Sequence, residues 1–291
     1  MKANNPSASS APARATRRRY IHIGGAFAAG GYFNRVGMDV PIDVVVPTVA
    51  SVELPMGGGL STATAKKFSV DCSKVKFGSM PKDALAKLRK TQLIAIDSAA
   101  TTCQSIRSTG DEPHRSATSV DVKGVKVDGD LSLKRVLLNL QSEHPRDQKY
   151  PRITFGPTEI AGLKLGKFKV TVELDLETFN KFPTLELLEP ALVQRDKGVS
   201  ASVANSFLRQ ADGSLYRNAS GYAIGSIVKS IKGVPQEWIE EDGYTINWPG
   251  FGKIVLGEIL VNAYLRRVTL VHLRHSCVDI GGGCDGGSTW P

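Results

Sequence analysis

The sequence predicts an all-β protein: an antiparallel β-sandwich, or a barrel-like sheet, with one or two short helices. In most patterned segments apolar residues alternate with polar ones, as strands with one buried face require. Turns that contain glycine or aspartate separate these segments, and 29 of the 291 residues are glycine. Many short strands divided in this way favour antiparallel sheets over a parallel sheet with crossover helices.

The clearest strand covers residues 167–176, where Phe168, Val170 and Val172 fall on one face and charged or polar residues on the other. Such a segment is typical of a half-buried strand with a solvated outer face. Shorter alternating segments predict further strands at 42–46, 68–77, 119–127, 131–138, 225–231, 253–261 and 267–273. Turns are expected at 56–59, 128–130, 161–162, 242–243 and 249–250.

Helices are expected in two places. Ser79, Pro81 and Asp83 provide an N-cap, a first-turn proline and an early acid, which predict a helix ending near residue 90. Residues 184–193 form a second candidate, which Pro190 would end or kink. The wider segment 176–220 is expected to be a helical and loop insertion in one β-rich domain that spans residues 20–291.

The first nineteen residues are expected to form a disordered basic arm, because residues 1–15 are rich in alanine, serine, proline and asparagine. Two interpretations of the following residues stay open. The sequence Thr16-Arg17-Arg18 before a glycine- and alanine-rich run is typical of a twin-arginine export signal, here continuing to about residue 33. Alternatively, the arm leads into a first strand at 20–27.

The net charge of +9 is concentrated at the N-terminus. Six positive charges precede the first acid, Asp39, and five of them lie in the first nineteen residues: Lys2, Arg14, Arg17, Arg18 and Arg19. In the rest of the chain 32 basic residues stand against 28 acidic ones and are interleaved with them, as on a solvated surface. Nucleic acid or another polyanion is therefore expected to bind only through Arg14, Arg17, Arg18 and Arg19. No apolar run approaches the roughly 20 residues that a membrane-spanning helix needs.

The four cysteines are Cys72, Cys103, Cys277 and Cys284, and they form no C-x-x-C motif. They allow three pairings. A bridge between Cys277 and Cys284 would close a short loop if glycines 281–283 form a turn. The alternative is free thiols in a cytoplasmic protein, so the cell compartment decides between a disulfide and free thiols.

The sequence predicts no catalytic, cofactor-binding or metal-binding residues. It contains no G-x-S-x-G nucleophile elbow and no G-x-G-x-x-G phosphate loop. His272 and His275 are the centre of the one cluster with metal-ligand chemistry, but their odd spacing places them on opposite faces of a strand. The sequence therefore favours a protein that is not an enzyme.

Aromatic residues are concentrated around a predicted hairpin at Trp238, Tyr244, Trp248 and Phe251. Such residues can form a platform for a sugar or anchor an interface. More often such rings pack in the core and around turns, and Pro249 and Gly250 favour packing around a turn here.

Several segments, taken in order, are similar to those of choice-of-anchor secreted or surface bacterial proteins. They are residues 51–59 (SVELPMGGG), 116–127, 160–163, 248–255, 267–273 and the glycine-rich 279–283. The resemblance implies a β-rich extracellular or envelope protein without assigned catalytic residues.

The leading hypothesis is a non-catalytic structural or binding protein of the bacterial cell envelope or exterior, with a protein or a glycan as its partner. The first alternative is a cytoplasmic β-rich protein that binds nucleic acid or another polyanion through its basic arm. The second alternative is a β-sandwich that binds or acts on carbohydrate.

Overall fold

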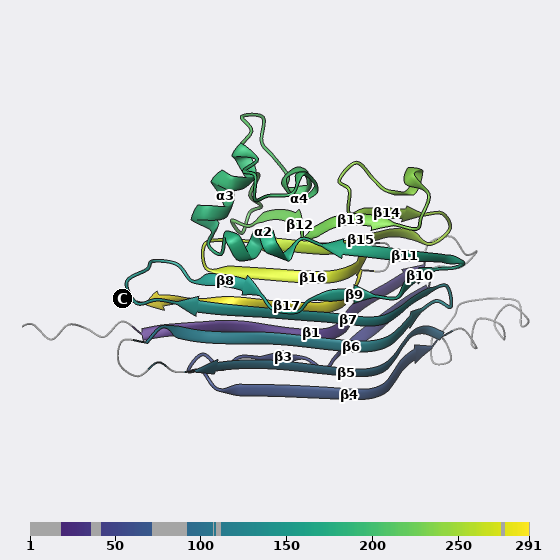
Figure 1. Cartoon of the computed structure of the whole chain (residues 1–291). Coiled ribbons are helices and arrows are strands. Elements are labelled where there is room, and N and C mark those ends of the chain that lie inside the picture. The colour runs from purple at the N-terminus through teal and green to yellow at the C-terminus, as the bar shows by residue number, and fades with distance from the viewer. Residues whose placement is uncertain are drawn as a thin grey trace, which may run out of the picture.

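The computed structural model describes residues 19–35, 42–71, 92–106, 108, 112–274 and 277–290. Two antiparallel sheets stack face to face, and the prediction of an all-β sandwich is confirmed (Figure 1). The helix expected at 79–90 lies outside the described residues, as do Arg14, Arg17 and Arg18.

The first sheet has eight strands. Six follow the order β12-β15-β16-β17-β1-β2, while β14 pairs with β15 and β3 with β1. The strands are β1 (Arg19–Arg35), β2 (Ile42–Val49), β3 (Val52–Glu53), β12 (Ala223–Ser226), β14 (Thr245–Trp248), β15 (Gly252–Val261), β16 (Leu265–Leu273) and β17 (Val278–Trp290).

The second sheet has nine strands. Seven follow the order β13-β11-β10-β7-β6-β5-β4, while β8 and β9 both pair with β7. The strands are β4 (Leu60–Asp71), β5 (Gln92–Ile106), β6 (His114–Val127), β7 (Leu131–His144), β8 (Arg152–Phe155), β9 (Glu159–Ala161), β10 (Leu163–Leu165), β11 (Phe168–Leu174) and β13 (Val228–Lys232).

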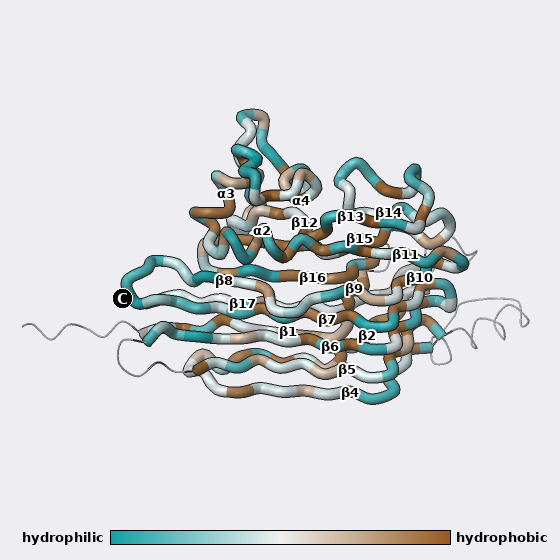
Figure 2. Tube along the Cα trace, viewed as in Figure 1, coloured by the Kyte–Doolittle hydropathy of each residue, from teal (hydrophilic) through white to brown (hydrophobic). Residues whose placement is uncertain are grey.

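The core lies between the sheets, where β1 and β17 pack across β5, β6 and β7. Val120, Val122, Leu138 and Leu140 point inward from the second sheet and are fully buried. Apolar and polar residues mix along these long strands, as one-sided burial requires (Figure 2). Burial of this apolar interior is the main force that holds the two sheets together.

The first strand β1 occupies an interior position, between β17 and β2. It pairs with β17 from Arg19, opposite Trp290, to Gly31, opposite Val278. Residues 19–35 therefore form a strand in this structure, which agrees with the second of the two sequence interpretations and extends that strand by nine residues. Processing at about residue 33 would remove most of an interior strand.

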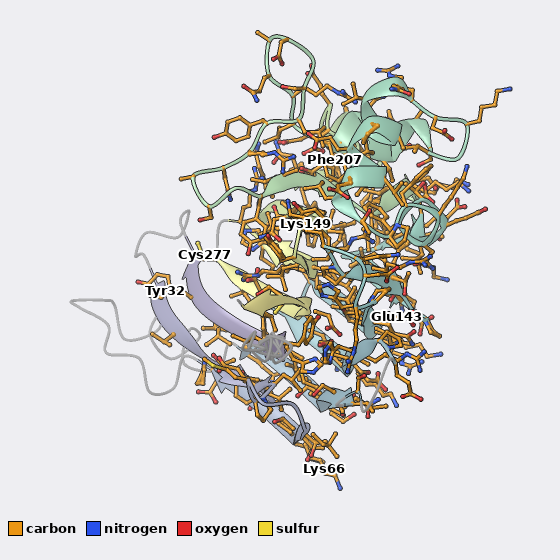
Figure 3. All side chains as sticks on the ribbon, turned by 90° about the vertical axis from the view of Figure 1, so that its left-hand side faces the viewer. Tyr32, Lys66, Glu143, Lys149, Phe207 and Cys277 are labelled. Carbon is orange, nitrogen blue, oxygen red and sulfur yellow. The ribbon has the colours of Figure 1, made fainter. Side chains whose placement is uncertain are left out.

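Three short helices lie in residues 176–206: α2 (Leu176–Lys181), α3 (Leu185–Gln194) and α4 (Ala201–Ser206). A one-turn 3₁₀ helix, η2 (Gln236–Trp238), follows later in the chain. Asp175, Thr184 and Ser200 accept backbone hydrogen bonds as N-caps. The helices rise above β12 and β15, so Phe207 and Lys66 on β4 lie at opposite ends of the molecule (Figures 1 and 3).

The helix expected at 184–193 is confirmed as α3, and Pro190 does not end it, since α3 continues to Gln194. A proline in this short helix removes only one backbone hydrogen bond, and its own position is exposed. One local prediction was wrong. The strand expected at 225–231 is divided at Ile227, whose amide donates to Gly257 and whose carbonyl accepts from Asp175. The chain crosses there from the first sheet to the second.

Within the described residues no helix is long and apolar enough to cross a membrane.

Candidate functional site

A surface hollow of about 440 Å³ lies between α3 and the turn that joins β15 to β16. We call it the tyrosine hollow. Its chemistry comes from two tyrosines, two glutamates, one arginine and one asparagine: Tyr150, Tyr264, Glu186, Glu189, Arg217 and Asn262. The helical insertion supplies the two glutamates and the arginine, and the sandwich supplies the remaining three residues.

The two tyrosine rings form the aromatic part of this hollow. Their centroids are 5.2 Å apart and the ring planes meet at 70°. The turn fixes Tyr264, because the Asn262 side-chain oxygen accepts from the amides of Tyr264 and Leu265 at 2.8 and 2.7 Å. Tyr264 keeps 39% of its surface exposed. The exposed ring surface is available to stack on the C–H face of a ligand.

Charged groups line the opposite side. Arg217 Nη2 donates to Glu189 Oε2 at 2.6 Å, and about a third of each side chain is exposed. Glu186, one turn earlier in α3, is exposed. Carboxylates and a guanidinium beside an aromatic ring provide acceptors and donors for a ligand rich in hydroxyl groups.

A second hollow, of about 490 Å³, crosses β5, β6, β7 and β8 on the outer face of the nine-stranded sheet. We call it the strand hollow. Strand register aligns Arg115, Glu143 and Arg152 in one row, with an Arg115–Glu143 ion pair of 3.3 Å. Gln141 and Thr154 form the next row. The surface is polar and open.

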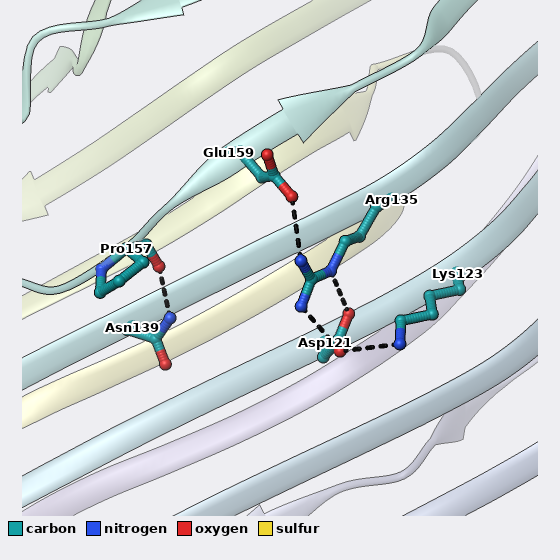
Figure 4. Close-up of polar contacts among 6 residues, drawn as sticks. All are labelled: Asp121, Lys123, Arg135, Asn139, Pro157 and Glu159. Carbon is teal, nitrogen blue, oxygen red and sulfur yellow. Dashed lines mark hydrogen bonds and ion pairs between the residues drawn. The ribbon is translucent and has the colours of Figure 1, made fainter.

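The same outer face carries an ion-pair network farther along the strands (Figure 4). Arg135 donates two hydrogen bonds to Asp121, at 2.8 and 3.1 Å, and a third to Glu159 at 3.2 Å. Lys123 also lies 3.4 Å from Asp121. Hydrogen bonds from Arg135 hold the pKa of Asp121 below its usual range. The network joins β6, β7 and β9, and each of its charged groups contacts a group of opposite charge.

Behind the strand hollow, five titratable side chains meet between the sheets. We call them the Tyr–His–Asp cluster: Tyr20, His22, His114, His144 and Asp285. The Tyr20 ring stacks on His114 with centroids 4.3 Å apart and meets the edges of His22 and His144 at 4.8 and 5.0 Å. The residues come from β1, β6, β7 and β17, so only the folded sandwich brings them together.

Asp285 is the one carboxyl of this cluster and has no exposed surface. Its Oδ1 accepts from Ser116 Oγ at 2.5 Å and from the Gly286 amide at 2.8 Å. Among the described residues its Oδ2 has no hydrogen-bond partner. Burial raises the pKa of Asp285 to about 7.

Burial acts on the neighbouring groups as well. It lowers the pKa values of His114 and His144, and the charge of Arg146 lowers that of His114 further. Burial also raises the pKa of Tyr20. Each shift favours the neutral form of the group, so the interior opposes charge on every one of these side chains.

The cysteine prediction fails in one part. Cys103, Cys277 and Cys284 are free thiols, and Cys72 lies outside the described residues. Glycines 281–283 form no turn: they belong to β17, so Cys277 and Cys284 stand seven residues apart along extended chain, roughly 20 Å. A disulfide requires a much shorter separation.

Glycines suit this strand because its neighbours approach closely. A Cβ on Gly282 would collide with the Phe27 ring, and one on Gly283 would press on Thr118 and Leu138. The glycine-rich segment is therefore a packing feature of the sandwich, and the turn interpretation was wrong.

The other sequence candidates are dispersed. Arg19 pairs through its backbone at the start of β1. His272 lies 2.5 Å from Asp279, and His275 is outside the described residues. In the part of the chain that the structure describes, no three His, Cys, Asp or Glu residues are arranged to hold a metal ion.

The predicted aromatic group divides into packing contacts. Trp248 stacks on Phe251 at 4.9 Å across the β14–β15 turn, while Trp238 meets the edge of Phe168 at 5.0 Å. Tyr244 is buried. A further aromatic pair, the half-buried Tyr150 and the partly exposed Tyr264, was not predicted to meet, because the two residues are 114 apart in the sequence.

Comparison with known protein families identifies a match that covers much of the chain. Residues 20–218 match the family model described as a domain of unknown function, DUF8256. No curated protein and no solved structure matches the chain. The match covers β1 through the insertion and more than half of the chain, and on this evidence the chain belongs to the DUF8256 family.

Proposed function

We propose that this protein is a non-catalytic binding or structural protein of the bacterial cell envelope or exterior, and that it binds a glycan in the tyrosine hollow. The observation that carries the proposal is the partly exposed ring of Tyr264 set against Tyr150 and faced by charged groups. Stacking on aromatic rings combined with hydrogen bonds to hydroxyl groups is the chemistry that a sugar requires.

The residues of the tyrosine hollow lie on two elements that hydrogen bonds and buried side chains hold in place. Asn262 and the backbone hydrogen bond from Gly287 to the Tyr264 carbonyl, at 3.0 Å, hold the turn. On the other side of the hollow, Leu185 and Leu188 are buried and anchor α3 to the sandwich. A preorganised site loses little entropy when a ligand binds.

The external location is supported by the ordered segments that resemble choice-of-anchor proteins. The interior position of β1 adds a condition: export must leave residues 19–35 in the mature chain. Intact-mass measurement on fractionated cells tests this part. We expect the protein in the envelope or medium fraction with β1 retained; a protein confined to the cytoplasm would contradict the proposed location.

Glycan binding is tested with immobilised bacterial glycans, including peptidoglycan fragments and envelope polysaccharides, against the full chain. We expect at least one glycan to bind and the Tyr264→Ala variant to lose about tenfold or more in affinity, because one stacking ring is removed. The matched control is Tyr32→Ala, since Tyr32 is exposed to nearly the same extent, 38%, and lies on β1 away from the hollow. An equal loss in both variants, or no binding at all, would contradict the proposal.

A further inference from the structure

The Tyr–His–Asp cluster occupies one end of the sandwich interior, where β1 begins and β17 ends. Tyr20 and His22 lie near the start of β1, opposite Thr289 and Gly287 of β17. His114 is the first residue of β6 and His144 the last of β7, and these two form a pair in the register. The ends of four strands thus meet at titratable side chains, in a place where the interior of a sandwich usually contains apolar residues.

Neutral hydrogen bonds satisfy part of the cluster. Ser116 donates to Asp285, Ser142 interacts with the Tyr20 hydroxyl, and His144 Nε2 lies 2.8 Å from the Gln148 carbonyl. The Nδ1 atoms of His114 and His144 have no hydrogen-bond partner among the described residues. The cluster is therefore well suited to neutral groups and poorly suited to charged ones.

The positively charged residue that is paired with Asp285 in the strand register makes its hydrogen bonds elsewhere. Arg266 on β16 lies directly opposite Asp285, but its guanidinium donates to the carbonyls of Phe179 and Phe182 at 3.1 and 2.7 Å. Within the described residues no ion pair joins Arg266 to Asp285. An ionised Asp285 would thus lie in the interior with hydrogen bonds as its only compensation.

The remaining nearby groups add no compensating charge. Arg115 and Glu143 point to the outer face of the sheet, where they pair with each other. Arg146, after β7, opposes a positive charge on His114. On β5, burial raises the pKa of Cys103 to about 11, so its thiol is neutral.

We propose that the Tyr–His–Asp cluster is a proton-sensing site, which holds the ends of β1 and β17 together while its members are neutral and loosens them when either the carboxyl or the imidazoles become charged. The proposal does not depend on glycan binding. It is a property of the strand junction and would hold for a protein with another ligand.

The direction of each response follows from burial. Asp285 has a pKa of about 7 in the folded protein, above its ordinary value, so it is neutral in mild acid and ionises as the pH rises through 7. His114 and His144 have lowered pKa values, so they stay neutral in mild acid and become protonated only at lower pH. The junction is thus most stable between these two limits.

The response should be local because the polar cluster is confined to this end. Farther along, β1 and β17 pack on apolar residues such as Leu138, which do not titrate. Opening the ends of the two strands exposes little of that core, and local openings of this kind require less free energy than global unfolding. The opening would also move Ser116 and Ser142, which line the strand hollow.

Hydrogen exchange measured by mass spectrometry on the full chain tests the proposal. After correction for intrinsic exchange rates, we expect the protection of residues 20–23 and 286–289 to be highest near pH 6 and at least tenfold lower at pH 4.5 and at pH 9. Peptides from the interior of β16 should keep their protection throughout, which shows that the protein remains folded.

Variants distinguish the loss of protection at high pH, caused by Asp285, from the loss at low pH, caused by the histidines. Asp285→Asn should abolish the loss at pH 9 and leave the loss at pH 4.5, while the double variant His114→Gln, His144→Gln should do the reverse. The control His272→Gln, Asp279→Asn removes a partly exposed pair on β16 and β17 and should change neither. Protection that does not vary with pH, or pH profiles that both cluster variants leave unchanged, would overturn the proposal.

Discussion

Arg266 and Asp285 face each other across the β16–β17 pairing, yet they do not form an ion pair. The Arg266 side chain is fully buried and reaches α2, where it donates to the carbonyls of Phe179 and Phe182 and lies 5.6 Å from the centre of the Phe179 ring. The arginine therefore caps the end of α2, and Asp285 belongs to a separate cluster.

Replacing Arg266 should destabilise the protein. Arg266→Met keeps the bulk but leaves two carbonyl oxygens at the end of α2 without their donors, and we expect a loss of roughly 2–4 kcal/mol in the free energy of unfolding. Urea denaturation measures the loss. Arg267→Met is the control, since Arg267 is exposed on the opposite face; an equal loss in both variants would contradict the capping role.

Asp285→Asn should stabilise the protein in a pH-dependent way. The folded-state pKa of about 7 lies above the ordinary value, so the stability that neutral Asp285 contributes is fully present below about pH 4 and is lost as the pH rises through 7. A difference of about three pKa units corresponds to roughly 4 kcal/mol. We expect the variant to gain up to this amount at pH 8.5 and little at pH 4.

Thermal unfolding of wild type and variant at these two pH values measures the gain. Asp279→Asn on the same strand is the control and should show no alkaline gain, because its carboxylate is partly exposed and lies against His272. If Asp285→Asn destabilises the protein at both pH values, Asp285 is held as a charge, contrary to our account.

Gly287 makes room for Tyr20. A Cβ at this position would collide with the Tyr20 hydroxyl and ring, so Gly287→Ala must displace the ring from the cluster. Overpacking of this kind typically costs about 1–3 kcal/mol. We expect a loss of stability in that range by thermal unfolding, whereas Ser288→Ala, on the next residue, should be close to wild type.

Truncation tests the place of β1. Deleting residues 1–18 leaves this strand complete and should preserve a single cooperative unfolding transition. Deleting residues 1–33 removes most of an interior strand and exposes the edges of β17 and β2, so we expect loss of that transition and aggregation. A stable, cooperatively folded product of the longer deletion would show that β1 is dispensable.

The fold class could be predicted because alternation is a local property. Phe168, Val170 and Val172 show it within five residues, and the strand that they predict is β11. Glycine gave a less reliable signal: glycines 281–283 look like a turn in the sequence, whereas in the sandwich they allow Phe27 and Thr118 to approach β17. That distinction depends on contacts from distant strands.

The tyrosine hollow and the Tyr–His–Asp cluster could not be predicted either, because each is formed by residues that are far apart in the sequence. Tyr20 and Asp285 are 265 residues apart in the sequence, and the β1–β17 pairing brings them near each other. Alternation does place Tyr20 and His22 on one face of the predicted first strand. It does not identify the strands that cover that face, so the cluster requires the register of both sheets.

Glycan binding in the tyrosine hollow is tested by calorimetric titration of one bound glycan into wild type, Tyr264→Ala and Tyr32→Ala. We expect wild-type affinity for Tyr32→Ala and a loss of about tenfold or more for Tyr264→Ala. Unchanged affinity in Tyr264→Ala, with the variant folded, would place the glycan elsewhere and contradict the claim.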